Sequence, residues 1–276
     1  MGRGERMAGE WPGLAAETQR IWEGLAAFWD GRMGEGNAFH LALVGPAAER
    51  LLGPVEGMEV LDIACGNGQF SRRLAELGAV VTATDFSPAF LKLAEGRAAG
   101  AEYAARIAYR QVDATDEAQI VALGEGRFDR VVCNMALMDM ATIEPLMRGV
   151  ARVLKASGHF VCTTMHPCFN SNPITLVLER EDRDGNLVDT YAVKVSRYRQ
   201  PFHYRGLGMP GQPVPQYYFH RALTDLLTPA FEAGLILDGL EEPVFGPKMG
   251  SERVLGWGSY TDIPPVLAVR LRRSCD

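Results

Sequence analysis

Two aspartates and two glycines are spaced as in a nucleoside-binding site within VLDIACGNGQFSRRLAELGAVVTATD, residues 60–85. Asp62 lies near the end of an apolar run, Gly66 and Gly68 follow it, and Asp85 ends a second apolar run. A glycine lets the backbone approach a ligand that a Cβ would block. An acid at the end of a second strand accepts the two hydroxyls of a ribose. These residue types predict a site for a nucleoside cofactor.

Two cofactor classes compete for this spacing. A dinucleotide site uses the pattern G-x-G-x-x-G and rests the pyrophosphate on a helix N-terminus. Here Ser71 stands at the third glycine position, and Asp62 before the turn would repel a diphosphate. A cationic nucleoside without phosphate suits these residues better than NAD does.

Short β-branched runs alternate with helical patterns around this stretch. Strands are expected at residues 59–64, 79–85, 107–114, 128–135 and 159–164, with helices at 69–78, 87–100 and 143–154 between them. Such alternation implies parallel strands joined by right-handed crossovers, and therefore an α/β doubly wound fold. The last two runs, 235–245 and 265–273, have no helix between them and should pair antiparallel.

The chain is expected to divide into four parts. Residues 1–57 form a loose tail and a helical cover, and residues 58–165 form the cofactor-binding core. Residues 166–222 interrupt the alternation as an inserted substrate cap, with two strands around an Asp184-Gly185 turn and then a loop rich in Gly, Pro and aromatic residues. Residues 223–276 complete the core with a helix and two strands.

Composition narrows the classes of partner. The 276 residues carry a formal net charge of -6, which argues against a nucleic-acid or anionic-membrane partner because phosphate binding needs an excess of Lys and Arg. Apolar runs stay well short of the ~20 residues of a membrane span. The five cysteines lack Cys-x-x-Cys spacing, so the sequence predicts neither a disulfide framework nor a metal site. A cytoplasmic protein is expected.

Four motifs resemble those of the class I S-adenosylmethionine-dependent methyltransferases of the small-molecule type. They are VLDIACGNG, VVTATDFS, RQVDATD and FDRVVCNMAL, and the resemblance covers residues 58–165. It implies a Rossmann-like, mostly parallel seven-stranded sheet with an antiparallel last strand, and S-adenosyl-L-methionine as cofactor. It further implies that the methionine moiety is held by Asp62, Ala64, Gly66 and Gly68. Asp85 would take the ribose hydroxyls.

The same resemblance assigns the adenine and the methyl-transfer end. Phe86 would pack on the adenine, while Asp113 and the backbone of Ala114 would read its edge. Asn134 and Met135 would flank the methionine. An alternative for Asp113, together with Asp116, is to cap a following helix. The alternative for Phe86 and Met135 is that they are ordinary residues of the hydrophobic core.

Methyl transfer needs a general base only where the acceptor must lose a proton. His166 follows the fifth expected strand in TTMHPCF and is therefore the candidate base, with a structural role in the loop before Pro167 as the alternative. His40 and His220 are further candidates for contact with the acceptor.

Residues 194–221 carry five bases, several aromatic residues and no acid. This asymmetry predicts a lid over an anionic or aromatic small molecule, with a solvated loop or an oligomer contact as the alternative. The candidates for substrate contact are Arg197, Arg199 and Tyr217. The sequence leaves the acceptor and the oligomeric state open.

The sequence therefore predicts a methyltransferase that moves a methyl group from S-adenosylmethionine to a small molecule by in-line displacement. Two alternatives remain. One is a regulatory subunit that binds S-adenosylmethionine without catalysis, and the other is a nicotinamide-dependent oxidoreductase, which Ser71 and Asp62 disfavour.

Overall fold

A seven-stranded sheet forms the centre of the computed structural model, which describes residues 11–171, 174–246 and 254–274. The strand order is β10-β11-β5-β4-β1-β2-β3. The strands are β1 (Glu59–Ile63), β2 (Val80–Asp85), β3 (Ile107–Gln111), β4 (Phe128–Asn134), β5 (Leu154–Met165), β10 (Leu235–Glu241) and β11 (Val266–Arg273). The expected tail over residues 1–10 lies outside the described ranges.

Strand directions agree with the sequence-based expectation. β1 to β5 pair in parallel, whereas β11 is antiparallel to both of its neighbours, β5 and β10. The predicted doubly wound, mostly parallel sheet with an antiparallel last strand is confirmed.

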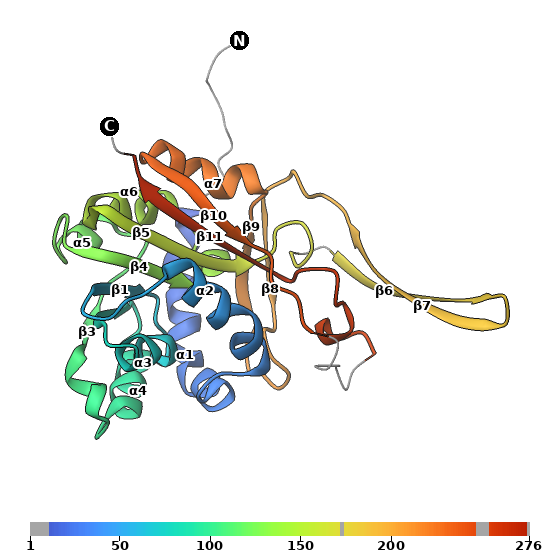
Figure 1. The fold of residues 1–276 in the computed structure, drawn as a ribbon, viewed down its shortest axis with the longest axis horizontal. Helices are drawn as coiled ribbons and strands as arrows, with labels where there is room; N and C mark the ends of the chain where they lie inside the picture. The colour runs from blue at the N-terminus through green and yellow to red at the C-terminus, as the bar shows by residue number, and fades with distance from the viewer. Residues whose placement is uncertain (1–10, 172–173, 247–253, 275–276) are drawn as a thin grey trace, which may run out of the picture.

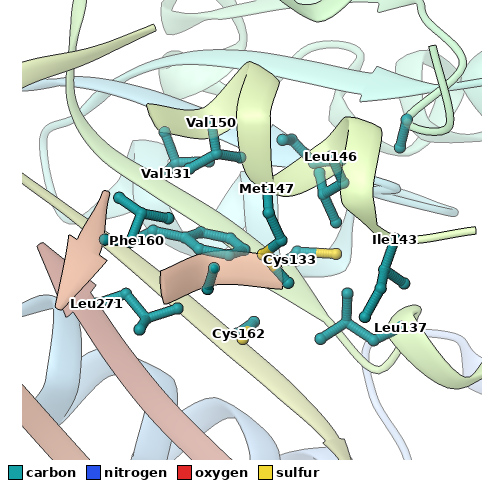
Figure 2. Close-up of a cluster of buried hydrophobic side chains, with 14 of the residues drawn as sticks. Val131, Cys133, Leu137, Ile143, Leu146, Met147, Val150, Phe160, Cys162 and Leu271 are labelled. Carbon is teal, nitrogen blue, oxygen red and sulfur yellow. The ribbon is translucent and has the colours of Figure 1, made fainter. Parts of the chain in front are cut away.

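Helices cover both faces of the sheet (Figure 1). α2 (Gly45–Leu52) and α3 (Gln69–Glu76) pack on one face, while α5 (Glu117–Val121), α6 (Glu144–Val153) and α7 (Leu223–Glu232) pack on the other. Figure 2 shows Met147 and Val150 of α6 against Val131 and Phe160 of the sheet, all of them buried. Burying such apolar side chains is the main stabilising contribution to this layer, at ~1.5–3 kcal/mol for each large residue.

The first long helix of the described chain packs on a helix that flanks β2 and β3. α1 (Ala15–Met33) packs against α4 (Pro88–Ala98), whose first turn is capped by the Ser87 hydroxyl accepting the backbone N–H of Phe90 at 3.1 Å. The described residues also contain five short helical turns: η1 (Pro12–Leu14), η2 (His40–Val44), η3 (Glu102–Arg106), η4 (Leu137–Asp139) and η5 (Trp257–Ser259). In the described part of the chain, no helix combines the length and apolar character that a membrane span requires.

Two hairpins follow β5. β6 (Ile174–Arg183) and β7 (Asn186–Val195) pair antiparallel around Asp184 and Gly185, whose φ angles of 53° and 82° suit the tight turn that was predicted there. This hairpin extends away from the rest of the molecule (Figure 1). β8 (Phe202–Gly206) and β9 (Gln216–His220) form a second hairpin where the sequence indicated only a loop.

Candidate functional site

One cavity of about 670 Å³ opens at the carboxyl ends of β1, β2 and β4, within the roughly 300–1,000 Å³ typical of small-molecule sites. Because parallel strands end at the same edge of a sheet, this is where an open α/β sheet binds its ligand. The structure brings together here nine of the ten residues predicted for the cofactor: Asp62, Ala64, Gly66, Asp85, Phe86, Asp113, Ala114, Asn134 and Met135. Gly68 is the exception.

The two glycines of the first turn have different roles. Gly66 has a φ of +56°, and no heavy atom lies within 4 Å of the position that a Cβ would take there, so a side chain would extend into the cavity. Gly68 has a φ of +73° and faces α4, where its Cβ would lie 2.9 Å from Ala94 Cβ. Gly68 therefore permits close packing of the turn on α4 and does not form part of the cavity wall.

Both strand-end aspartates are buried beside the cavity. Asp85 accepts the backbone N–H groups of Gly66 at 3.0 Å and Ser87 at 2.9 Å, and Asp62 accepts the Ser71 hydroxyl at 2.5 Å. Burial raises the pKa of Asp62 to about 7 and that of Asp85 to about 6. Among the residues that the structure describes, neither carboxylate has a cationic partner, so each favours a positively charged ligand.

The third motif places Asp113 at the cavity and Asp116 outside it. Asp113 accepts a hydrogen bond from Gln19 of α1 at 2.5 Å and from the Thr115 hydroxyl at 2.7 Å. Asp116 caps α5 by accepting the Ala118 N–H at 2.9 Å. Of the two acids that were alternatives for a helix cap, Asp116 takes that role.

The end of β4 presents a polar group without a partner. Asn134 Oδ1 accepts the Thr163 hydroxyl at 3.0 Å, whereas its Nδ2 is buried and unpaired within the described residues. Buried polar atoms are rarely left unpaired, because each costs about 1–3 kcal/mol. In the described part of the chain six side chains carry such an atom, and four of them line this cavity: Trp22, Trp29, Asn134 and Asp139. Their concentration marks a ligand site.

The predicted base lies outside the cavity wall. His166 is buried, with Nε2 2.8 Å from Glu242 Oε1 and Nδ1 accepting the Cys168 N–H at 3.1 Å. Both ring nitrogens are therefore engaged, and the pKa of His166 is lowered by burial against the opposing effect of Glu242. This placement supports the structural role for His166 that was its alternative.

His40 is the predicted histidine that does line the cavity. Its Nδ1 lies 3.1 Å from Asn37 Oδ1, and burial lowers the pKa of the ring to about 4. His40 is thus neutral near pH 7 and offers no charge to an anionic acceptor.

The other predicted substrate contacts are not brought to the cavity. Arg197 donates to Gln200 at 3.2 Å and Arg199 to Thr224 at 3.0 Å, both on exposed surface. The Tyr217 hydroxyl donates to Glu17 at 3.1 Å. His220 is buried with both ring nitrogens engaged, by Ser171 at 2.5 Å and by the Tyr198 carbonyl at 2.7 Å.

Several cavity residues were not singled out from the sequence. Tyr204 and Tyr218 line the cavity from the β8–β9 hairpin, Trp29 from α1, and Asp139 from η4. The aromatic residues of the segment 194–221 were noted as a group, whereas nothing in the sequence points to Asp139 beyond its position after the strand-four motif.

Comparison with known proteins gives a consistent assignment of the core. Residues 61–162 match a family model described as a methyltransferase domain. A ubiquinone biosynthesis O-methyltransferase of Alkalilimnicola ehrlichii is 34% identical over 122 residues, which are 44% of this chain and 46% of that protein. A demethylmenaquinone methyltransferase of Clavibacter sepedonicus is 33% identical over 131 residues, 48% of this chain and 49% of that protein. The chain thus spans about half the length of the curated relatives it matches.

Solved structures extend the likeness beyond the core. The crystal structure of an S-adenosylmethionine-dependent methyltransferase from Mesorhizobium loti has a TM-score of 0.63 and 27% identity, covering 83% of this chain and 96% of that chain. The family model, described as a methyltransferase domain, and the solved structure both confirm the resemblance seen in the four motifs.

Proposed function

We propose that this protein transfers a methyl group from S-adenosylmethionine to a small-molecule acceptor. The supporting observation is that nine predicted residues from four separate motifs line one cavity. The names of the relatives, which include O-methyltransferases of ubiquinone biosynthesis, also favour a small acceptor. We further propose a cytoplasmic location.

The cavity wall suits this cofactor on its own chemistry. Gly66 leaves space that a side chain would fill, Asp85 keeps carboxylate lone pairs for two ribose hydroxyls, and the unpaired Asn134 Nδ2 offers a donor at the end of β4. The buried carboxylates of Asp62 and Asp85 favour a cation. When bound, a sulfonium supplies an already activated methyl group. The chain has to bind and align the two reactants, which supplies ~7–11 kcal/mol of the barrier in well-oriented reactions.

Calorimetric titration tests the proposal directly. We expect S-adenosylmethionine and S-adenosylhomocysteine to bind in preference to NAD. Asp85→Ala should weaken both by at least about 10- to 150-fold, which is the loss of a single charged hydrogen bond of ~1.5–3 kcal/mol. Asp116→Ala is the control, since it removes an aspartate that caps α5 outside the cavity. Tight binding of NAD alone would overturn the assignment.

The affinity for S-adenosylmethionine should depend on pH. The raised pKa values, about 7 for Asp62 and about 6 for Asp85, mean that both groups bind protons below neutral pH in the free protein. A bound cation favours the ionised carboxylates, so binding releases protons and the affinity rises with pH. We expect an increase of about 10-fold or more from pH 5 to pH 8.

Titration at pH 6.5 in two buffers of different ionisation enthalpy measures this proton release. The observed enthalpies should differ between the buffers in proportion to the protons released. Equal enthalpies together with an affinity that does not change with pH would contradict the prediction.

A further inference from the structure

Asp139 is a half-buried acid that the binding of the cofactor does not account for. It ends η4, just after the strand that carries Asn134, and it lines the cavity. Its Oδ1 atom is buried without a hydrogen-bond partner among the described residues. Burial raises the pKa of its carboxyl well above the usual range. An unpaired buried oxygen destabilises the fold. We therefore expect the Asp139 carboxyl to face a ligand group that pairs with it.

A buried arginine fixes the turn that carries Asp139. Arg221, which follows β9, is only 4% exposed. Its guanidinium donates to the carbonyls of Leu137 at 3.2 Å, Met140 at 2.9 Å and Ala141 at 3.1 Å. These three carbonyls flank Asp139 on both sides. Arg221 therefore positions Asp139 without neutralising it through any of these bonds.

A one-way chain of hydrogen bonds orients the neighbouring Tyr218 hydroxyl. The Gly208 N–H donates to Gln212 Oε1 at 3.0 Å, and Gln212 Nε2 donates to the Val214 carbonyl at 2.6 Å and to Gln216 Oε1 at 2.5 Å. Gln216 Nε2 then donates to the Tyr218 oxygen at 2.8 Å. The two backbone groups fix the direction of both amides, so the Tyr218 hydroxyl keeps its own proton to donate.

Aromatic rings enclose the same end of the cavity. Tyr204 and Tyr218 stack with ring centroids 5.2 Å apart, and a Cβ on Gly208 would lie 2.7 Å from the Trp29 ring and 2.9 Å from the Tyr218 hydroxyl. Tyr218 and Asp139 both line this cavity, and besides burial the negative charge of Asp139 raises the pKa of Tyr218. Aromatic faces beside a carboxylate attract cationic and N–H-bearing groups.

The charges of the cavity wall also favour a ligand with a cationic or N–H-bearing group. Among the described residues that line the cavity, none is Lys or Arg, whereas five are acids: Asp30, Asp62, Asp85, Asp113 and Asp139. Asp30 is paired with Arg97 from outside the lining, which leaves the other four acids to set the charge of the wall. His40 is neutral at pH 7 because burial lowers its pKa to about 4. Such a wall repels an anionic acceptor and admits a neutral or cationic one.

We propose that the acceptor is an amine and that the Asp139 carboxylate binds its N–H between Tyr218 and Trp29. This inference rests on the proposed methyl transfer. The amine reacts in its neutral form, having left its extra proton in solvent. Its nitrogen lone pair forms a bond to the methyl carbon while the carbon–sulfur bond breaks and its electron pair goes to sulfur. The nitrogen then gives one proton to the Asp139 carboxylate. The reacting nitrogen, the sulfur and the Asp139 carboxyl are then all neutral, so the step itself creates no new buried charge.

Binding to the protein loaded with S-adenosylhomocysteine tests the proposal. The probes are phenethylamine, tyrosol and 3-phenylpropionate, which offer an amine, hydroxyl groups and a carboxylate on similar skeletons. We expect phenethylamine to bind most tightly to the wild type, and Asp139→Asn to weaken its binding by about 10- to 150-fold, as expected for a lost charge-assisted hydrogen bond. Transfer of a labelled methyl group to phenethylamine should show the same loss as a rise in KM.

Three controls keep the outcomes distinct. Asp189→Asn makes the same chemical change in the exposed hairpin, where Asp189 pairs with Arg180, and should leave phenethylamine binding unchanged. S-adenosylhomocysteine should bind Asp139→Asn as it binds the wild type, and if it binds neither protein the proposed function itself fails. Asp139→Glu keeps the acid and should bind the amine better than Asp139→Asn does.

Two results would overturn the amine assignment while leaving cofactor binding intact. One is preferred binding of tyrosol or 3-phenylpropionate over phenethylamine. The other is equal binding of phenethylamine by the wild type and Asp139→Asn. If Asp139→Asn weakens S-adenosylhomocysteine instead, Asp139 belongs to the cofactor site and the proposal is wrong.

Discussion

Gly66→Val abolishes most of the affinity for S-adenosylmethionine, with an expected loss of about 100-fold. The valine side chain would extend into the cavity, where no heavy atom lies within 4 Å of a Cβ, and overlap with a ligand costs ~1–3 kcal/mol. Separately, the φ of +56° lowers the stability of the fold by about 1–2 kcal/mol, because a β-branched residue is strained in this backbone conformation. Calorimetric titration measures the loss.

Gly126→Val is the control that separates backbone strain from steric blocking of the cofactor. Gly126 has a φ of +59° and equally open space around its Cβ position, but it lies outside the cavity. It should lose stability as Gly66→Val does and keep its affinity for the cofactor. If both variants lose affinity alike, or if Gly66→Val binds as tightly as the wild type, the cofactor does not occupy the space above Gly66.

Arg221→Leu is expected to be the most destabilising single change in residues 194–221. It removes the donor to three buried carbonyls, those of Leu137, Met140 and Ala141. The Ala141 and Leu137 carbonyls keep a backbone partner, the N–H of Trp11 at 3.0 Å and that of Met140 at 3.4 Å. The loss is therefore that of the bonds to the charged guanidinium, at ~1.5–3 kcal/mol each, and the free energy of unfolding should fall by roughly 3–5 kcal/mol. This is a large part of the ~5–15 kcal/mol that stabilises a typical domain. Urea denaturation followed by circular dichroism measures it.

Arg199→Leu provides the comparison within the same basic segment. Arg199 is exposed and donates to one threonine hydroxyl, so its loss should change the free energy of unfolding little. Equal effects of the two substitutions would show that the Arg221 contacts with the η4 turn contribute nothing to stability.

The cofactor side of the site could be predicted because topology alone positions it. Asp62, Gly66 and Asp85 each follow or end a parallel strand, and neighbouring parallel strands bring their carboxyl ends to one edge. The parallel direction of these strands follows from the alternation of strands and helices. Local spacing was therefore enough to place these three residues together.

The acceptor side could not be predicted in this way. Asp139, Tyr218 and Trp29 come from three distant segments, and only tertiary packing brings them to one wall. Residues 207–215, rich in Gly and Pro, separate β8 from β9 and do not match a short hairpin turn, so this pairing was missed. His166 stands at the end of β5 as expected, but Glu242, which engages its ring, is 76 residues away.

The β6–β7 hairpin provides a place to modify the protein without disturbing its chemistry. Its tip at Asp184 and Gly185 is remote from the cavity lining, and exposed loop tips tolerate insertions best. Its base is anchored, because Tyr191 packs on Tyr260 and the Tyr260 hydroxyl donates to the Val177 carbonyl at 3.3 Å. A fluorophore or surface-attachment tag grafted between Asp184 and Gly185 would therefore immobilise or label the molecule with its cavity open to both reactants.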